Sequence, residues 1–396
     1  MRIVLAFSGG LDTSFCVPWL QETKGAEVIT AIVDTGGIPR SQLDAIARQA
    51  RAVGAAEHHE IDARQAVWDG FVSTLIRGNV LRGEVYPLSV AAERTQQAME
   101  VAALARRLGA DAVAHGSTGA GNDQVRFDIV FRTLLPELPI IAPVRSLGLS
   151  REASQAYLRE RGLPVPEGSG RYSVNQGLWG TTFGGEWTHD PWTPPPEDAF
   201  PPAGEAPAVG EVILGWEEGL PVTLNEEPLA GPDLVEALAA LAAPYGIGRG
   251  IHIGETVLGI KGRIGFEAAA ALILIAAHRE LEKIVLTRWQ AFWKDHLARF
   301  FGDRLHEGQA LDPVMDDIRA LIASSQKRVT GRTRVRLDRG HFQVVGVESP
   351  ASLFDAGVAR YGETHSLWTG EQAEAFAAIA AIPSRLAHGR ARREGA

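Results

Sequence analysis

The stretch LAFSGGLDTSF, residues 5–15, places two glycines, one carboxylate and three hydroxyls directly after a short apolar run. Backbone N–H groups at such a turn point outward at a helix N-terminus, and glycines let the backbone approach a ligand closely, so the stretch suits an anion such as a phosphate. Its spacing matches neither the Gly-Lys-Ser/Thr closure of a P-loop nor the dinucleotide-binding G-x-G-x-x-G motif. An ordinary turn with Asp12 or Thr13 as the helix cap would use the same residues, and from the residues alone both interpretations have equal weight.

A second stretch, AHGSTGAGNDQVRFD at 114–128, also leads from an apolar run through a glycine-rich turn into a helical pattern. Helical spacing puts Asn122, Asp123 and Arg126 on one face of its first turns. Arg126 can bind a carboxylate through two parallel hydrogen bonds, and Asp123 can bind an ammonium, so the trio suits a zwitterionic ligand. A capped helix with one internal ion pair is the alternative, and the presence of both turns favours the ligand.

The elements around these turns must bring them together. Up to about Pro164, short β-branched runs alternate with longer amphipathic ones, which predicts a parallel sheet with helices on both faces. The expected strands are 2–7, 27–34, 111–116 and 139–144, and the expected helices include 41–55 and 94–110. Ligands of open α/β sheets bind at the carboxyl ends of the strands, where both turns are expected to lie.

The composition changes after Pro164. Gly, Trp and Pro accumulate up to Tyr245, and consecutive prolines exclude helix and central strand there, so we expect a second domain. The sequence then predicts strands within 248–263, a helix at 234–243, a long helical region at 266–301, a hairpin at 332–349 and a final amphipathic helix at 370–390. We expect a nucleotide-binding domain at 1–165, a synthetase domain at 166–360 and a C-terminal oligomerisation helix at 361–396.

Composition excludes several classes of protein. The chain has 396 residues, of which 45% are hydrophobic, a net charge of −9 and one cysteine, Cys16. One cysteine cannot form an internal disulfide or a Cys-rich metal site, and the histidines lack metal-ligand spacing. The negative charge argues against nucleic acid as the main partner. No apolar run approaches the ~18 residues of a membrane span and no signal layout begins the chain, so we expect a cytoplasmic protein without membrane contact.

The segment SGGLDTS after the first strand resembles the pyrophosphate loop of the N-type ATP pyrophosphatases. Over nearly its whole length the chain resembles argininosuccinate synthase, since seven stretches follow that family's order and spacing: LAFSGGLDTSF, AHGSTGAGNDQVRF, YSVNQGLWG, DPWTPPPED, GIKGR, AAHRELEK and SSQKRVTG. The resemblance implies a doubly wound, Rossmann-like parallel α/β sheet, an α+β synthetase domain and a C-terminal helical arm. It also implies ATP-dependent joining of citrulline to aspartate through a citrullyl-adenylate in arginine biosynthesis, in a homotetramer that exchanges its C-terminal arms. Asp12 places a carboxylate beside the phosphate site, which is explained by a Mg²⁺ ion between them or by a hydrogen bond from Asp12 to the loop itself.

Carried over position by position, the resemblance assigns site residues. For ATP these are Ala6, Phe7, Ser8, Gly9, Gly10, Leu11, Asp12, Thr13, Ser14, Asp34 and Gly116. For aspartate they are Thr118, Asn122 and Asp123. For citrulline they are Tyr86, Asn122, Arg126, Ser173, Thr182 and Glu255. Asp12, Arg94 and Asp123 are assigned to catalysis.

Some positions depart from the family pattern: Phe7 and Phe266 replace tyrosines, Ala91 a serine, and Ala120 a lysine. A glutamate that contacts citrulline in the family falls on Gly254, with Glu255 adjacent. An ammonium left without acceptors in a closed site costs ~1–3 kcal/mol per lost partner. Either Glu255 and Tyr86 rebuild the ammonium site, or the pocket accepts a citrulline with an acylated α-nitrogen; we expect the first.

Two other functions compete with this one. A tRNA-thiolating ATP pyrophosphatase would use the same loop, but it would need catalytic cysteines beyond Cys16 and a basic surface for RNA. A nucleotide-binding homologue with altered catalysis is favoured only by the changed citrulline contacts.

Overall fold

The computed structural model describes residues 1–166, 172–200, 204, 209–355, 357, 362 and 367–394. Its described part divides into two compact units, Met1–Ala351 and Ser352–Ala396. The boundary expected at 165/166 falls within the first unit and stays a prediction, as does the boundary at 360/361, which lies outside the described residues.

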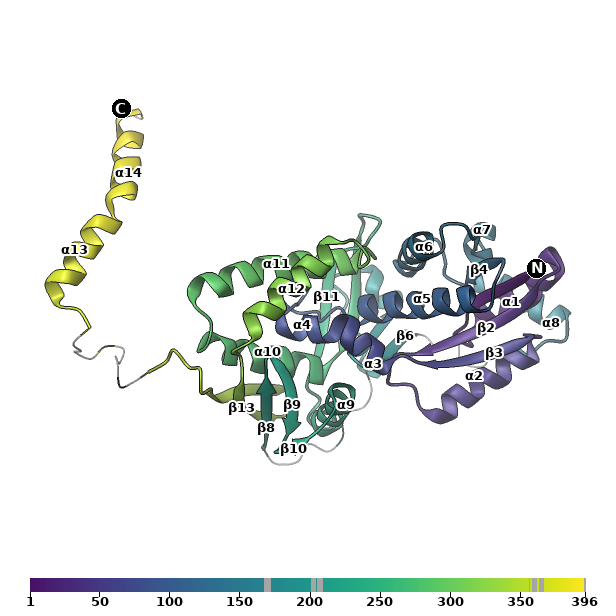
Figure 1. Ribbon diagram of the computed structural model, residues 1–396. Helices are drawn as coiled ribbons and strands as arrows, with labels where there is room; N and C mark the ends of the chain where they lie inside the picture. The colour runs from purple at the N-terminus through teal and green to yellow at the C-terminus, as the bar shows by residue number, and fades with distance from the viewer. Residues whose placement is uncertain are drawn as a thin grey trace. The chain divides into compact units, whose positions relative to one another are not determined.

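A five-stranded parallel sheet forms the N-terminal part of the first unit, in the order β3-β2-β1-β4-β5 (Figure 1). Its strands are β1 Arg2–Ala6, β2 Glu27–Asp34, β3 Glu57–Asp62, β4 Ala112–His115 and β5 Ile140–Ile141. β1 lies at the centre, and its last residue, Ala6, pairs with Ala31 of β2 and with His115 of β4. The carboxyl ends of β1 and β4 are therefore neighbours, which brings the two glycine-rich turns to one edge.

Helices cover both faces of this sheet, which confirms the predicted doubly wound architecture. They are α1 Leu11–Lys24, α2 Arg40–Ala52, α5 Ser89–Arg107, α6 Asp123–Leu134, α7 Pro143–Leu147 and α8 Arg151–Glu160. Ile3 and Leu5 of β1 pack in a buried cluster with α1 and α2 side chains, whereas Val4 packs in another cluster with α5 and α6 side chains. This alternation follows the two-residue period of a strand and gives each face its own apolar layer.

Two antiparallel sheets follow. The first, in the order β11-β12-β7-β6, contains β6 Tyr172–Gly177, β7 Gly180–Gly185, β11 Arg249–Glu255 and β12 Lys261–Glu267. The second, in the order β10-β9-β8-β13-β14, contains β8 Gly210–Glu217, β9 Leu220–Leu224, β10 Glu227–Pro228, β13 Gly331–Asp338 and β14 His341–Glu348. The expected hairpin at 332–349 is confirmed by β13 and β14.

The remaining helices of the first unit are α3 Arg64–Val67, α4 Ser73–Arg77, α9 Gly231–Ala242, α10 Ala269–Lys283, α11 Arg288–His306 and α12 Val314–Gln326, with short turns at Trp68–Val72, Glu186–His189, Glu197–Ala199 and Ala243–Tyr245. The helical region expected at 266–301 was wrong at its start, where Phe266 and Glu267 end β12. The rest is two helices, because Thr287 caps α11 in a reciprocal arrangement with Gln290. α11 then continues to His306, which places its last turn beside the site described below.

The second unit contains α13 Gly370–Ala380 and α14 Ile382–Glu394, two helices where the sequence predicted one. Large apolar side chains on them, including Phe376 and Ile379, are mostly exposed. Across the described part of the chain, we find no helix with the length and apolar character that crossing a membrane requires.

Candidate active site

The first glycine-rich turn joins β1 to α1. Gly9 has a φ of +74°, and a Cβ atom there would lie 2.9 Å from Cγ1 of Ile46. Gly10, with a φ of −75°, has an extended backbone open to any residue. The Thr13 hydroxyl donates to the Gly10 carbonyl at 3.2 Å and lies 3.3 Å from Oγ of Ser8. The need for glycine conformational freedom therefore rests on Gly9.

The second turn packs directly on the first. A Cβ atom on Gly116 would lie 2.9 Å from Cγ2 of Thr13 and 3.1 Å from its backbone nitrogen. Asp12, in the first turn of α1, has its pKa raised by burial, an effect that the nearby Arg151 of α8 opposes. Two turns from separate strands thus form one surface of backbone and small side chains.

A cavity of about 540 Å³ opens beside these turns. Nine of the predicted site residues line it: Asp12, Tyr86, Thr118, Asn122, Asp123, Arg126, Ser173, Thr182 and Glu255. The predicted residues that lie outside its lining are Ala6, Phe7, Ser8, Gly9, Gly10, Leu11, Thr13, Ser14, Asp34, Arg94 and Gly116. Asp34 instead ends β2 and accepts a hydrogen bond from the backbone of Gly36 at 2.8 Å.

Asp123 is the charged centre of the cavity wall. Its Oδ2 accepts from Nε of Arg94 at 3.1 Å, and its Oδ1 accepts from Nη1 of Arg126 at 3.0 Å. Burial alone would raise the pKa of Asp123, but the two guanidinium groups outweigh it and hold that pKa below its usual value. Arg94 also donates to the side chain of Asn175, so it contacts two residues that line the cavity without lining it itself.

Arg126 is 3% exposed and is held from a second side by His306, at the end of α11. Its Nε donates to the backbone carbonyl of His306 at 3.1 Å, and its Nη2 lies 3.3 Å from Nδ1 of the same residue. Among the described residues, contacts engage three of the five guanidinium N–H donors, which leaves two for a ligand.

The β11–β12 hairpin closes another side of the cavity. Oδ1 of Asn122 accepts from the backbone N–H of Val257 at 2.8 Å. In the part of the chain that the structure describes, this leaves the amide nitrogen of Asn122 for a ligand. Glu255 pairs with Lys261 across the hairpin at 2.8 Å, and this lysine lowers the pKa of the exposed carboxyl. Glu255 is thus ionised at the cavity rim, with its charge partly compensated.

Tyr86 forms the apolar side of the same region. Its hydroxyl accepts from the backbone N–H of Val90 at 3.2 Å and lies 3.3 Å from Oγ of Ser89, while its ring stacks on His252 at 5.6 Å. Phe266 packs against the same ring at 5.4 Å. Ala91 and Phe266 lie outside the cavity lining and are each 1% exposed, so these two departures from the family pattern belong to the large buried apolar cluster that also contains Tyr86.

The antiparallel sheet supplies Ser173, Asn175 and Thr182. Asn175 and Thr182 are opposite each other on β6 and β7, and Ser173 lies two residues before Asn175, so all three share one face. The lining residues that the sequence did not single out include Ser117, Gln124, Arg151, Asn175, His252, Thr256, Arg263 and His306. Ser117, Gln124, Asn175 and Arg263 lie within stretches that carry the family resemblance, but no role was assigned to them there. The other four, Arg151, His252, Thr256 and His306, reach the cavity through tertiary folding and lie in no such stretch.

Comparisons with known proteins identify relatives of the chain. The family model described as "Arginosuccinate synthase N-terminal HUP domain" matches residues 2–164, and the "Arginosuccinate synthase C-terminal domain" matches residues 172–387. The argininosuccinate synthase of Methanothermobacter thermautotrophicus is 39% identical, with 97% of each chain covered. That of Xylella fastidiosa is 40% identical over 97% of this chain and 96% of its own, and that of Sulfurisphaera tokodaii is 36% identical over 98% of each.

Proposed function

The chain belongs to the argininosuccinate synthase family, and on that premise we propose that its central cavity joins citrulline to aspartate at the expense of ATP. The ureido oxygen of citrulline attacks the α-phosphorus of ATP and releases pyrophosphate. The aspartate amine then attacks the ureido carbon, AMP leaves, and argininosuccinate is formed. The enzyme is a ligase that forms a C–N bond and acts in arginine biosynthesis.

One observation carries this proposal: the two glycine-rich turns meet at Gly116 and Thr13, directly beside a cavity walled by Asp123 and Arg126. A nucleotide and an amino acid with a carboxylate would therefore bind next to each other. The reaction needs little proton transfer from side chains, so holding three charged substrates in line would supply most of the rate.

We assign the substrates to parts of the cavity by charge. The turn from Ala6 to Ser14, together with Asp34 and Gly116, would hold ATP. The free donors of Arg126 would bind the citrulline carboxylate, helped by Ser173 and Thr182. Thr118, Asn122 and Asp123 would bind aspartate, and Arg94 would act beside the reacting groups through its contact with Asp123.

Magnesium would enter with the nucleotide. Within the described ranges no cluster of three or more His, Cys, Asp or Glu side chains could hold a metal ion. Asp12 lines the cavity at the phosphate-binding turn, so it fits as one protein ligand to an ion that the ATP phosphates also bind. The ion would offset phosphate charge, and Arg151 would contribute a fixed positive charge nearby.

We also propose that the protein is a homotetramer. The apolar side chains of α13 and α14 are exposed in their own unit, and burial against another subunit would remove them from water. Light scattering should give a tetramer, and deleting the residues after Gly370 should reduce it. A monomer, or an unchanged assembly after the deletion, would contradict this.

We also propose that the protein functions in a reducing compartment such as the cytoplasm, because its single cysteine is buried and free.

The test of the function is release of pyrophosphate from ATP by the purified protein. We expect release to require citrulline and aspartate together and to yield argininosuccinate. Release that depends on tRNA and a sulfur donor would favour a thiolase, and ATP binding without release would favour a nucleotide-binding homologue.

A further inference from the structure

His306 stands out because it lies 180 positions along the chain from Arg126 and yet touches it twice. It is 7% exposed and lines the central cavity. Its backbone oxygen and its Nδ1 both lie on the side of the guanidinium that carries Nε and Nη2. One edge of Arg126 is therefore fixed by a single residue of α11.

The contacts define the protonation of the imidazole. An arginine side chain only donates hydrogen bonds, so Nδ1 of His306 is the acceptor and the proton lies on Nε2. Nε2 donates to the backbone carbonyl of Glu255 at 3.2 Å. Burial lowers the pKa of His306 to about 3, and the positive charges of Arg126 and Arg82 act in the same direction. The ring is therefore neutral when the enzyme works.

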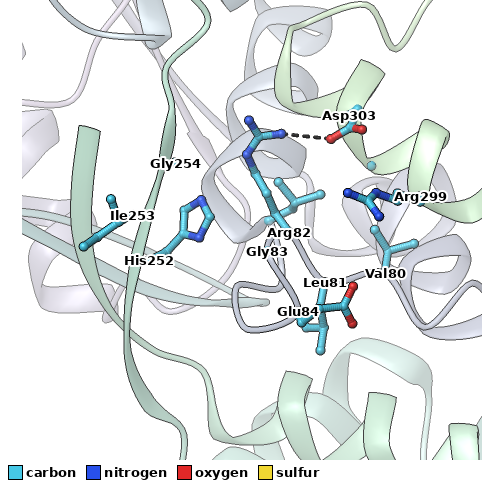
Figure 2. Close-up of a pocket in the computed structure, with 12 residues that line it drawn as sticks. Val80, Leu81, Arg82, Gly83, Glu84, His252, Ile253, Gly254, Arg299 and Asp303 are labelled. Carbon is cyan, nitrogen blue, oxygen red and sulfur yellow. Dashed lines mark hydrogen bonds and ion pairs between the residues drawn. The ribbon is translucent and has the colours of Figure 1, made fainter. Parts of the chain in front are cut away.

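A second link holds the same carbonyl. Nη2 of Arg82 donates to the Glu255 carbonyl at 3.1 Å, while Nη1 of Arg82 donates to Asp303 at 3.0 Å. Figure 2 shows this arginine directed at Asp303 in an adjoining cavity of about 410 Å³, which shares His252 and Gly254 with the central one. Asp303 precedes His306 by one turn of α11, so that turn fixes both the end of β11 and Arg126.

From this geometry we propose that His306 is a positioning residue, which aims the two free donors of Arg126 at the carboxylate of citrulline. The inference rests on the function proposed above. Asp123 engages Nη1 and His306 engages Nε and Nη2, so the guanidinium is held at both of its sides. A carboxylate bound through two parallel hydrogen bonds requires such a fixed orientation.

The variants are designed to separate the two side-chain contacts of His306. In His306→Asn, the amide oxygen occupies the region of Nδ1 and can still accept from Arg126. In His306→Gln, the amide reaches the region of Nε2 and can serve Glu255 in its place. His306→Leu removes both contacts. His341→Leu, at an exposed position on β14, is the matched control.

Each protein is measured with citrulline and with citrullinamide, in which a neutral amide replaces the carboxylate. The amide is assayed as a substrate, or as a competitive inhibitor where its turnover is too slow. We expect His306→Leu and His306→Gln to lower kcat/KM for citrulline about tenfold or more, with little effect on citrullinamide. His306→Asn and the control should stay near wild type, and KM for aspartate should not change.

Equal losses on both compounds would overturn the inference, because a purely structural role weakens every substrate alike. A His306→Leu variant as active as wild type on citrulline would also overturn it. If this variant does not fold, the Asn and Gln pair carries the same comparison. Failure of the underlying function has another signature: wild-type enzyme that does not turn over citrulline, or that does not distinguish it from citrullinamide.

Discussion

Nε of Arg94 donates to Oδ2 of Asp123 at 3.1 Å, and this contact joins the second turn of α5 to the first turn of α6. The same carboxylate holds Arg126, so its negative charge organises two guanidinium groups. Replacing it with a neutral amide should disturb both arginines.

Asp123→Asn should lower kcat/KM for aspartate and for citrulline by about ten- to a hundredfold, since a hydrogen bond to a charged group is worth roughly 1.5–3 kcal/mol. Steady-state kinetics on each substrate check this. Asp316→Asn, which changes an exposed ion pair on α12, serves as the control and should have no effect. Normal kinetics in Asp123→Asn would remove this residue from the site.

The pH dependence of stability gives a second test of Asp123. Its pKa is lower in the folded protein than in the unfolded chain, so its ionised form contributes stability above the unfolded value. That contribution is lost as the pH falls through the folded pKa. Acid unfolding of Asp123→Asn, followed by circular dichroism, should therefore lack part of the wild-type loss at low pH. Identical acid transitions would contradict the ion pairs.

The glycine turn predicts different results at two adjacent positions. Gly10→Val should abolish ATP use, because the added side chain keeps the backbone from approaching the phosphates. The fold should persist, because the backbone of Gly10 is extended and the nearest atom to a Cβ at this position, Oγ of Ser8, would lie 3.4 Å away. Gly9→Ala should also lower stability, by roughly 1–3 kcal/mol, because of its positive φ and the contact with Ile46. Urea unfolding and ATP binding are the measurements. Unchanged ATP affinity and turnover in Gly10→Val would refute the assignment of the turn to phosphate.

The amino end of citrulline is tested at Glu255. Glu255→Gln should reduce citrulline turnover about tenfold, and N-acetylcitrulline should be inert, because Glu255 is the ionised carboxyl at the rim of the cavity. Lys261→Met, which releases Glu255 from its partner, should retain or improve citrulline binding. If Glu255→Gln leaves citrulline turnover unchanged and the enzyme prefers the acylated compound, the pocket serves a different substrate.

Glu93 makes stability depend on pH in the opposite direction from Asp123. It is 1% exposed, and burial raises its pKa to about 8, while the backbone N–H of Trp179 donates to Oε1 at 3.4 Å. The unfolded chain releases this proton near the ordinary glutamate pKa of 4.5, so stability falls as the pH rises from there toward 8. Glu93→Gln should be more stable than wild type at pH 8, by roughly 1–3 kcal/mol, and nearly equal at pH 4. Urea unfolding at fixed protein concentration should then give diverging pH curves, and parallel curves would contradict the raised pKa.

The elements that the sequence predicts well are those whose pattern is local. β1, β2 and β4 are apolar runs, and the helices after both glycine turns follow at once. The sequence pattern does not predict β3, because its residues, EHHEID, form a polar edge strand with little buried surface. Of the strand expected at 139–144, only Ile140 and Ile141 form a strand, because Pro143 begins a helix there.

The site residues also differ in whether a local pattern or only tertiary packing marks them. Asn122, Asp123 and Arg126 lie at the start of one helix, and their spacing together with the two neighbouring glycine-rich turns indicated a common role. Arg151, Asn175 and His306 come from separate elements, and only tertiary packing brings them to the cavity. The resemblance to a family supplied Ser173 and Thr182, whose strands lie in a Gly- and Trp-rich stretch without a clear strand pattern.

The hold of α11 on Arg126 has a consequence for how such an enzyme can be recombined. The N-terminal sheet alone would carry the nucleotide turns, yet its arginine would lack the partner that fixes its direction. A chimera that exchanges this sheet between related enzymes should therefore keep ATP affinity and lose discrimination between amino acids, unless the last turn of α11 is transplanted with it. The substrate specificity of the N-terminal half of the chain therefore depends on a helix of the C-terminal half.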